Sequence, residues 1–219
     1  MTTPRLASIQ VGQPREMNDE GWPDRRTGPW VSAIIKERVE GSAFLSSTNL
    51  AGDKQGNPAV HGGPDKAVLG YGAGRYPLWL QDLGIELPHG AFGENMTIER
   101  LDEESVCIGD IYAIGLAMVQ VSSPRQPCWK IARRWGIKTL TATVDKTGRT
   151  GWYHRVLTEG NIEAGNEVTL LERPHPEWTV MRATRVMQNR RRDMAAANEL
   201  ASLEPLAETW KTALLTPSG

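Results

Sequence analysis

The chain has 219 residues, with 25 Lys plus Arg against 26 Asp plus Glu, a net charge of −1 and two cysteines. Balanced charge argues against nucleic acid or an acidic membrane as a partner, and two cysteines are too few for a disulfide framework. The apolar runs are too short to cross a membrane and the N-terminus does not resemble a secretory signal. We therefore expect a cytoplasmic protein with one substantial domain and at most a small appendix.

The N-terminal part predicts short strands separated by irregular segments. Residues 5–11 alternate weakly and indicate a first strand, and residues 12–29, rich in Pro, Gly, Asp and Arg, indicate a loop. A second strand is expected over 30–39, resuming at 43–45 after Gly41. Residues 49–68 show little periodicity, and such long stretches in compact domains are usually functional or disordered.

The middle of the chain predicts more strands and a few helical turns. A short helix is expected over 76–83, ended by Gly84, and a hairpin is expected around Gly115. The remaining elements expected here are a strand over 91–98, a helical turn over 130–135, and strands over 148–157 and 165–172. Many short strands with irregular connections favour a mainly β fold, a β-barrel with a few short helices.

Pro174 and Pro176 predict a boundary, because the period becomes helical beyond them. We expect one helix over 187–201 and a second one capped by Ser202, with Pro205 in its first turn. The apolar face of the second helix comprises Leu203, Leu206, Ala207, Trp210, Ala213 and Leu214. The chain thus divides into an N-terminal strand and loop (1–29), a barrel (30–173) and a small helical domain (174–219).

Cys128 lies in the segment Pro124-Arg125-Gln126-Pro127-Cys128-Trp129-Lys130, directly after an apolar strand. The prolines fix the backbone, and the neighbouring Arg125 and Lys130 favour the thiolate, the form that binds metals. The alternative is a small buried hydrophobic residue, as most free cysteines are. Cys107, in a strand-like context, is interpreted as a packing residue.

Four motifs, in this order and spacing, resemble the MOSC domain, named for the C-terminal part of molybdenum cofactor sulfurases, in its YiiM-like branch. The motifs are His61-Gly62-Gly63-Pro64-Asp65-Lys66-Ala67, Phe92-Gly93-Glu94-Asn95, Gly109-Asp110 and Pro124-Arg125-Gln126-Pro127-Cys128. The resemblance extends from about residue 30 to 172, and the helical tail resembles the 3-alpha domain of that branch.

The resemblance implies a β-barrel that binds the pyranopterin form of the molybdenum cofactor, with Cys128 as the thiolate ligand of molybdenum. It also implies an oxidoreductase that detoxifies N-hydroxylated compounds, such as hydroxylaminopurine-like bases and amidoximes, with electrons from a separate reductase. Protein made by overexpression can lack the cofactor, because its supply is often limiting. Pyridoxal phosphate is not expected, since it belongs to a separate domain of the sulfurases.

One part of the sequence departs from the pattern of that branch. Residues 70–76 read Gly-Tyr-Gly-Ala-Gly-Arg-Tyr, with Gly70 at the usual first histidine of the motif His-x-Tyr-Pro-x-Glu-His-Tyr. Two histidines and a glutamate are thus absent. If those residues shape the substrate mouth, the departure bears on substrate range more than on cofactor binding.

Beside the resemblance, each candidate residue has its own chemistry. Arg125, Lys66 and Lys130 suit the phosphate and polar pterin of the cofactor, and Asn95 with the backbone of Gly62 and Gly63 can hydrogen-bond the pterin edge. His61 can donate to phosphate or shuttle a proton, or be a structural loop residue. Asp65 is a candidate acid, with capping a turn or orienting a cation as the alternative.

Two other functions remain open. The first is a molybdenum cofactor carrier or sulfur-transfer module, with a persulfide on Cys128 and no turnover of its own. The second is nucleic-acid binding through the helical tail, whose run Arg190-Arg191-Arg192 is typical of a solvated face.

Overall fold

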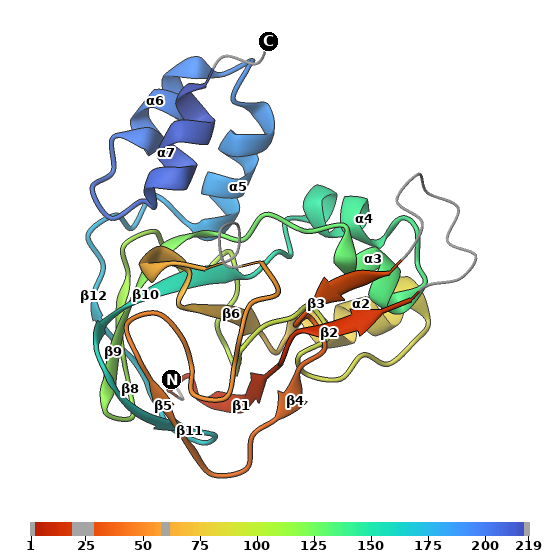
Figure 1. The fold of residues 1–219 in the computed structure, drawn as a ribbon. Coiled ribbons are helices and arrows are strands. Elements are labelled where there is room, and N and C mark those ends of the chain that lie inside the picture. The colour runs from red at the N-terminus through yellow and green to blue at the C-terminus, as the bar shows by residue number, and fades with distance from the viewer. Residues whose placement is uncertain (1–2, 19–28, 58–61, 217–219) are drawn as a thin grey trace.

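The computed structural model describes residues 3–18, 29–57 and 62–216 (Figure 1). Its strands are β1 (Leu6–Val11), β2 (Arg15–Met17), β3 (Trp30–Ser32), β4 (Glu37–Arg38), β5 (Ser42–Leu45), β6 (Val68–Gly72), β7 (Met96–Ile98), β8 (Ile111–Ile114), β9 (Ala117–Pro124), β10 (Trp152–Thr158), β11 (Gly160–Glu163) and β12 (Val168–Glu172). Its helices are η1 (Pro64–Lys66), α2 (Arg75–Leu83), α3 (Lys130–Trp135), α4 (Leu140–Thr147), α5 (Val180–Asn189), α6 (Met194–Ala201) and α7 (Glu208–Leu215).

The centre of the molecule is an eight-stranded sheet in the order β12-β8-β9-β10-β6-β7-β1-β4, with β6 and β7 as its parallel pair. The strand β12 at one end of this sheet meets β1 near the other end, because the backbone NH of Leu6 donates to Asn166 O at 2.9 Å and that of Val168 donates to Pro4 O at 2.9 Å. The sheet therefore closes on itself, which confirms the expected mainly β, barrel-like fold.

The barrel strands form because their apolar residues alternate with polar ones. Along β9, Ala117, Val119 and Val121 are buried while Met118 and Gln120 are half-buried. Burial of each such aliphatic side chain contributes about 1.5–3 kcal/mol. The resulting core lies inside the barrel, and β6 separates it from a second apolar cluster, which includes Tyr71, Trp79 and Phe92, beneath α2, α3 and α4.

The C-terminal helices pack on the barrel and share its core. Trp178, Leu200 and Trp210 belong to the same hydrophobic cluster as the barrel strands. Backbone bonds also tie the two parts together: Ala207 NH donates to Ser122 O at 2.8 Å and Ile108 NH to Trp178 O at 2.9 Å. The helices therefore have a fixed position relative to β9, and the boundary at residue 174 stays a prediction.

Two expectations for the helical tail are wrong. The region expected to hold one helix over 187–201 contains the end of α5 and the whole of α6. Asp193 lies between them, and its carboxylate caps α6 by accepting from Ala196 NH at 3.0 Å. Ser202 ends α6 instead of starting the next helix, which begins at Glu208. The apolar face predicted from Leu203 to Leu214 identified residues that are buried, but tertiary contacts decide where the helices begin and end.

Two differences occur before the tail. The strand expected over 91–98 is reduced to β7, because residues 88–94 form turns around the buried carboxylate of Glu94, which accepts from Gly90 NH at 2.6 Å. Helix α4 was not expected, because Thr141, Thr143, Val144 and Thr147 are β-branched and form helices poorly. Among the described residues, no helix has the length and apolar character needed to cross a membrane.

Candidate functional site

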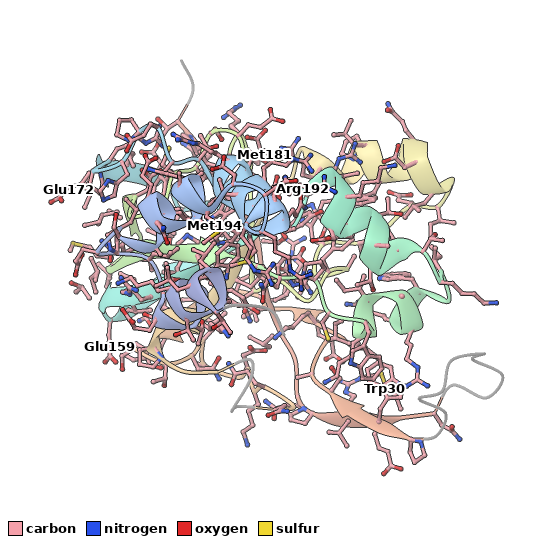
Figure 2. The ribbon with its side chains drawn as sticks, turned by 90° about the horizontal axis from the view of Figure 1, so that it is seen from above. Trp30, Glu159, Glu172, Met181, Arg192 and Met194 are labelled. Carbon is pink, nitrogen blue, oxygen red and sulfur yellow. The ribbon has the colours of Figure 1, made fainter. Side chains whose placement is uncertain are left out.

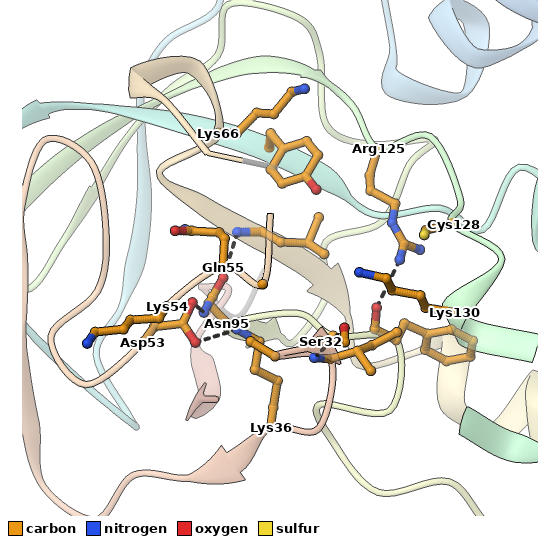
Figure 3. A pocket seen from close by; sticks show the side chains of 17 residues that line it. Ser32, Lys36, Asp53, Lys54, Gln55, Lys66, Asn95, Arg125, Cys128 and Lys130 are labelled. Atoms are coloured by element: carbon orange, nitrogen blue, oxygen red, sulfur yellow. Dashed lines mark hydrogen bonds and ion pairs between the residues drawn. The ribbon is translucent and has the colours of Figure 1, made fainter. Parts of the chain in front are cut away.

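A pocket opens on the barrel where six separate segments of the chain converge (Figure 3). It comprises about 620 Å³ of open space, which includes the solvent at its mouth. The lining residues are Ser32, Ala33, Ile34, Lys36, Asp53, Lys54, Gln55, Gly56, Lys66, Leu69, Phe92, Gly93, Asn95, Arg125, Cys128, Lys130 and Tyr153. Four residues predicted to bind the cofactor, Lys66, Asn95, Arg125 and Lys130, thus lie around one pocket with Cys128.

Cys128 is held between the end of β9 and the start of α3. Its carbonyl oxygen accepts from Ile131 NH at 3.1 Å and from Thr141 Oγ1 at 3.3 Å. The thiol is free and half-buried. Cys107, by contrast, is buried, donates its thiol to Pro176 O at 3.5 Å, and has its pKa raised to about 11 by burial. Of the two cysteines, only Cys128 faces the pocket.

Arg125 is the most buried cation among the described residues of the pocket, with 6% of its surface exposed. Its Nη2 donates to Phe92 O at 3.1 Å, but its buried Nη1 has no hydrogen-bond partner within the described part of the chain. The side chain also lies beside Tyr153, whose pKa is raised by burial, an effect that the charge of Arg125 partly opposes. Because an unpaired buried donor is costly, Nη1 is available to a ligand.

The pocket carries more positive than negative charge. Lys36, Lys54, Lys66, Arg125 and Lys130 line it, and Asp53 is the one carboxylate among its described lining residues. Burial lowers the pKa of Lys66, an effect that the charge of Asp65 partly opposes. Such a pocket favours an anionic ligand.

Asp53 and Asn95 organise the inner wall of the pocket. The Asn95 amide donates to Asp53 Oδ2 at 2.9 Å and its oxygen accepts from Leu69 NH at 3.2 Å. Asp53 in turn forms an ion pair with Lys36 and accepts from Gly12 NH at 2.6 Å. Burial lowers the pKa of Lys36 against the opposing effect of Asp53. Asn95 therefore positions the Lys36–Asp53 pair, and its amide is already engaged by protein atoms.

Only part of the motif that runs from His61 to Ala67 lies at the pocket. His61 lies outside the described residues. Gly63 adopts a φ of 99° and opens η1, in which Lys66 NH donates to Gly63 O at 3.0 Å. Neither Gly62 nor Gly63 lines the pocket. The motif thus brings Lys66 to the pocket through the sharp turn at Gly63, which few residues other than glycine adopt.

Asp65, predicted to be catalytic, points to a different part of the barrel. Its carboxylate forms an ion pair with Arg155 of β10 at 2.8 Å, and its carbonyl accepts from Ser122 Oγ at 2.6 Å. It does not line the pocket. These contacts match the alternative interpretation, a carboxylate that orients a cation.

Several pocket residues were not found from the sequence. Lys36 follows a strand pattern and carried no motif, while Asp53, Lys54 and Gln55 lie in the 49–68 stretch that lacks periodicity. The lack of periodicity in that stretch could have indicated Asp53, Lys54 and Gln55, because long irregular segments are often functional. Lys36 and Tyr153 gave no such signal.

Gly70, where the sequence departs from the resembled pattern, is enclosed by the barrel core. A Cβ atom at this position would lie 2.9 Å from the His154 ring and 3.1 Å from Trp152 Nε1. His154 is 1% exposed and accepts from that same Trp152 nitrogen at 3.0 Å. The space beside Gly70 is therefore filled by a histidine of β10.

Comparisons with known proteins agree with this architecture. A family model described as MOSC domain matches residues 57–169. The chain is 38% identical over 210 residues to the uncharacterised protein YflK of Bacillus subtilis (strain 168), covering 96% of this chain and 92% of that protein. It is 40% identical over 167 residues to a protein of Gibberella moniliformis named Reductase, covering 74% of this chain and 30% of that protein.

A solved structure is also similar over nearly the whole length. The crystal structure of YiiM from Geobacillus stearothermophilus superposes with a TM-score of 0.80 at 31% identity, covering 96% of this chain and 97% of that chain. The matched residues include β6 to β10 and the segment that carries Cys128. With its barrel, its pocket and these matches, the chain belongs to the MOSC domain family.

Proposed function

We propose that the pocket binds the pyranopterin molybdenum cofactor, with Cys128 as its thiolate ligand, and that the protein reduces N-hydroxylated compounds. The observation that carries this proposal is the free Cys128 thiol in one pocket with Arg125, whose buried Nη1 has no partner among the residues that the structure describes. A thiol supplies the soft ligand that such a metal takes, and a guanidinium suits a phosphate or a pterin oxygen.

The pocket residues fit the parts of this cofactor. Lys54, Lys66 and Lys130 supply positive charge for its phosphate, while Ile34, Leu69 and Phe92 provide apolar wall for its ring system. When bound, the cofactor would supply the two-electron chemistry: reduction of an N–OH group consumes two electrons and two protons and releases water. The chain would bind and orient both the cofactor and the substrate.

We further propose that the electrons come from a separate reductase. The Gibberella relative is a reductase by name, and most of that protein lies outside the part matched by this chain. A domain of this kind on a longer reductase is consistent with a barrel that receives electrons from another domain or protein.

A second candidate is a cofactor carrier or sulfur-transfer module that holds a persulfide on Cys128. It is favoured by the half-buried thiol, which a second protein can reach through the pocket mouth. Cyanide releases a persulfide sulfur as thiocyanate. Thiocyanate released by the wild type but not by Cys128→Ala, without reduction of any N-hydroxylated compound, would support this candidate.

The decisive experiment uses protein from a host that makes the cofactor. We expect stoichiometric molybdenum by elemental analysis and reduction of benzamidoxime or 6-hydroxylaminopurine with reduced methyl viologen as donor. Cys128→Ala should abolish this activity without loss of folding, whereas the matched control Cys107→Ala should keep it. Wild-type rates in Cys128→Ala would refute the assignment of the ligand.

A further inference from the structure

A second cleft lies beside the Cys128 segment, between the barrel and the C-terminal helices. Its walls come from the segment 125–127, from α4 and from α5, with Trp210 of α7 also contributing. It comprises about 1,320 Å³ of open space, which includes the solvent at its mouth. Arg125 lines both this cleft and the pocket of Cys128. Figure 2, viewed from above, shows α5 to α7 over the barrel with α4 next to them. We call this space the helical cleft.

Hydrogen bonds fix the helical cleft in place. Gln188 Nε2 donates to Asp145 O at 2.6 Å, and Arg185 Nη1 donates to Lys146 O at 2.7 Å, so that α5 is attached to the C-terminal end of α4. The start of α7 is attached to β9 through Ala207 and Ser122. The cleft is therefore a preformed feature, because hydrogen bonds fix the elements on both of its sides.

The helical cleft also contacts the segment that carries the thiol. Thr141 lines the cleft and donates to the Cys128 carbonyl at 3.3 Å. Arg125 and Pro127, three and one residues before the cysteine, form its wall. A ligand in the cleft would thus lie against the same short segment that presents Cys128 to the pocket.

The lining combines apolar surface with hydrogen-bond donors. Pro127, Ala142, Met187 and Trp210 provide the apolar part. Arg190 donates through Nη1 to Met187 O at 3.1 Å, while its buried Nε has no partner within the described residues. Guanidinium donors over apolar walls suit a flat aromatic ligand with acceptor nitrogen or oxygen atoms on its edge.

We propose that the helical cleft binds the aromatic part of the N-hydroxylated substrate, an aromatic amidoxime or hydroxylated nucleobase, with Arg190 as a specificity-determining residue. This inference rests on the proposed function. It assigns the cofactor to the barrel and substrate selection to the C-terminal helices.

The test is to fill the cleft from an exposed position. Ala142 is exposed and lines the cleft, so Ala142→Trp should raise KM for benzamidoxime roughly tenfold with little change in kcat or molybdenum content. KM for the small acetamidoxime should change much less. Lys146→Trp, on the same helix but outside the lining, is the matched control and should behave as wild type.

A second pair of variants removes donors without adding bulk. Arg190→Met should raise KM for benzamidoxime about fivefold, whereas Arg192→Met, which lies outside the cleft lining, should leave it unchanged. This pair decides the question should Ala142→Trp not fold. An unchanged KM in Arg190→Met, or equal effects in variant and control, would overturn the inference.

A binding measurement separates this inference from the proposed function. Ligand-observed NMR should detect benzamidoxime on cofactor-free wild type and on Lys146→Trp, but not on Ala142→Trp. Binding retained in Ala142→Trp would overturn the inference. Binding lost in that variant, with no reduction by molybdenum-loaded wild type, would leave the cleft assigned and remove the proposed reductase activity.

Discussion

Two arginines of this protein, Arg173 and Arg125, have opposite environments. Arg173 is one-third exposed, yet its guanidinium makes two bonds to the fully buried Asp110, at 2.8 and 2.6 Å. Arg125 is 6% exposed, yet one of its nitrogens has no partner among the described residues. A cation that the fold pairs can be explained by stability alone, whereas a more deeply buried cation with one nitrogen left without a hydrogen bond indicates a ligand.

The largest effect should come from breaking the paired site. Asp110 also accepts from Tyr112 Oη at 2.8 Å and from Cys107 NH at 2.9 Å, so Asp110→Asn should lower the free energy of unfolding by about 3 kcal/mol. This is the lower end of the range for a broken buried pair, because Arg173 can turn toward water. Urea denaturation would measure it, with the exposed Glu172→Gln as a control expected to change little.

Should Asp110→Asn unfold at the same urea concentration as the wild type, the Gly109-Asp110 motif would not have the structural role given to it. The pair would then need another explanation, and the contrast between Arg173 and Arg125 would weaken.

The barrel interior also contains a histidine that the fold keeps neutral. Burial lowers the pKa of His154 to about 3, from 6.5, and its Nε2 accepts from the Trp152 indole. Because the folded-state pKa is depressed, the unfolded chain takes up a proton first as pH falls below 6.5. Stability should therefore be lost between pH 6.5 and pH 3.

Between pH 7.5 and 5, His154 should account for about 2 kcal/mol of lost stability. Urea unfolding of wild type and His154→Leu at both pH values would measure it as the difference between the two pH dependences. His89, whose pKa burial also lowers, contributes to both proteins and cancels. Equal pH dependence in the two proteins would show that His154 titrates normally.

The smallest change in stability should come from Arg125. Arg125→Met loses the bond to Phe92 O but also removes a buried charge, so the free energy of unfolding should change by less than about 1 kcal/mol. Molybdenum content, in contrast, should fall at least about tenfold if the guanidinium holds the cofactor. Destabilisation comparable to Asp110→Asn, with full molybdenum content, would place Arg125 with Arg173 as a structural residue.

The sequence by itself determined the local part of this structure. Alternating apolar residues predicted the hairpin of β8 and β9, Gly84 predicted the end of α2, and Pro124 to Cys128 predicted a thiol fixed after a strand. These features depend on backbone preferences and on the period of burial, which neighbouring residues set.

Only the tertiary structure decided which charges are paired. Lys36 and Asp53, 17 residues apart, form an ion pair at the pocket wall. Asp65 forms an ion pair with Arg155, 90 residues away, outside the pocket. Tertiary contacts also stabilise α4 despite its β-branched residues, because its own Leu140 and Val144 are buried. Pairing and burial depend on contacts between distant segments, and the local sequence pattern does not contain this information. These contacts place Arg125 beside Cys128, with its Nη1 left without a hydrogen-bond partner among the described residues.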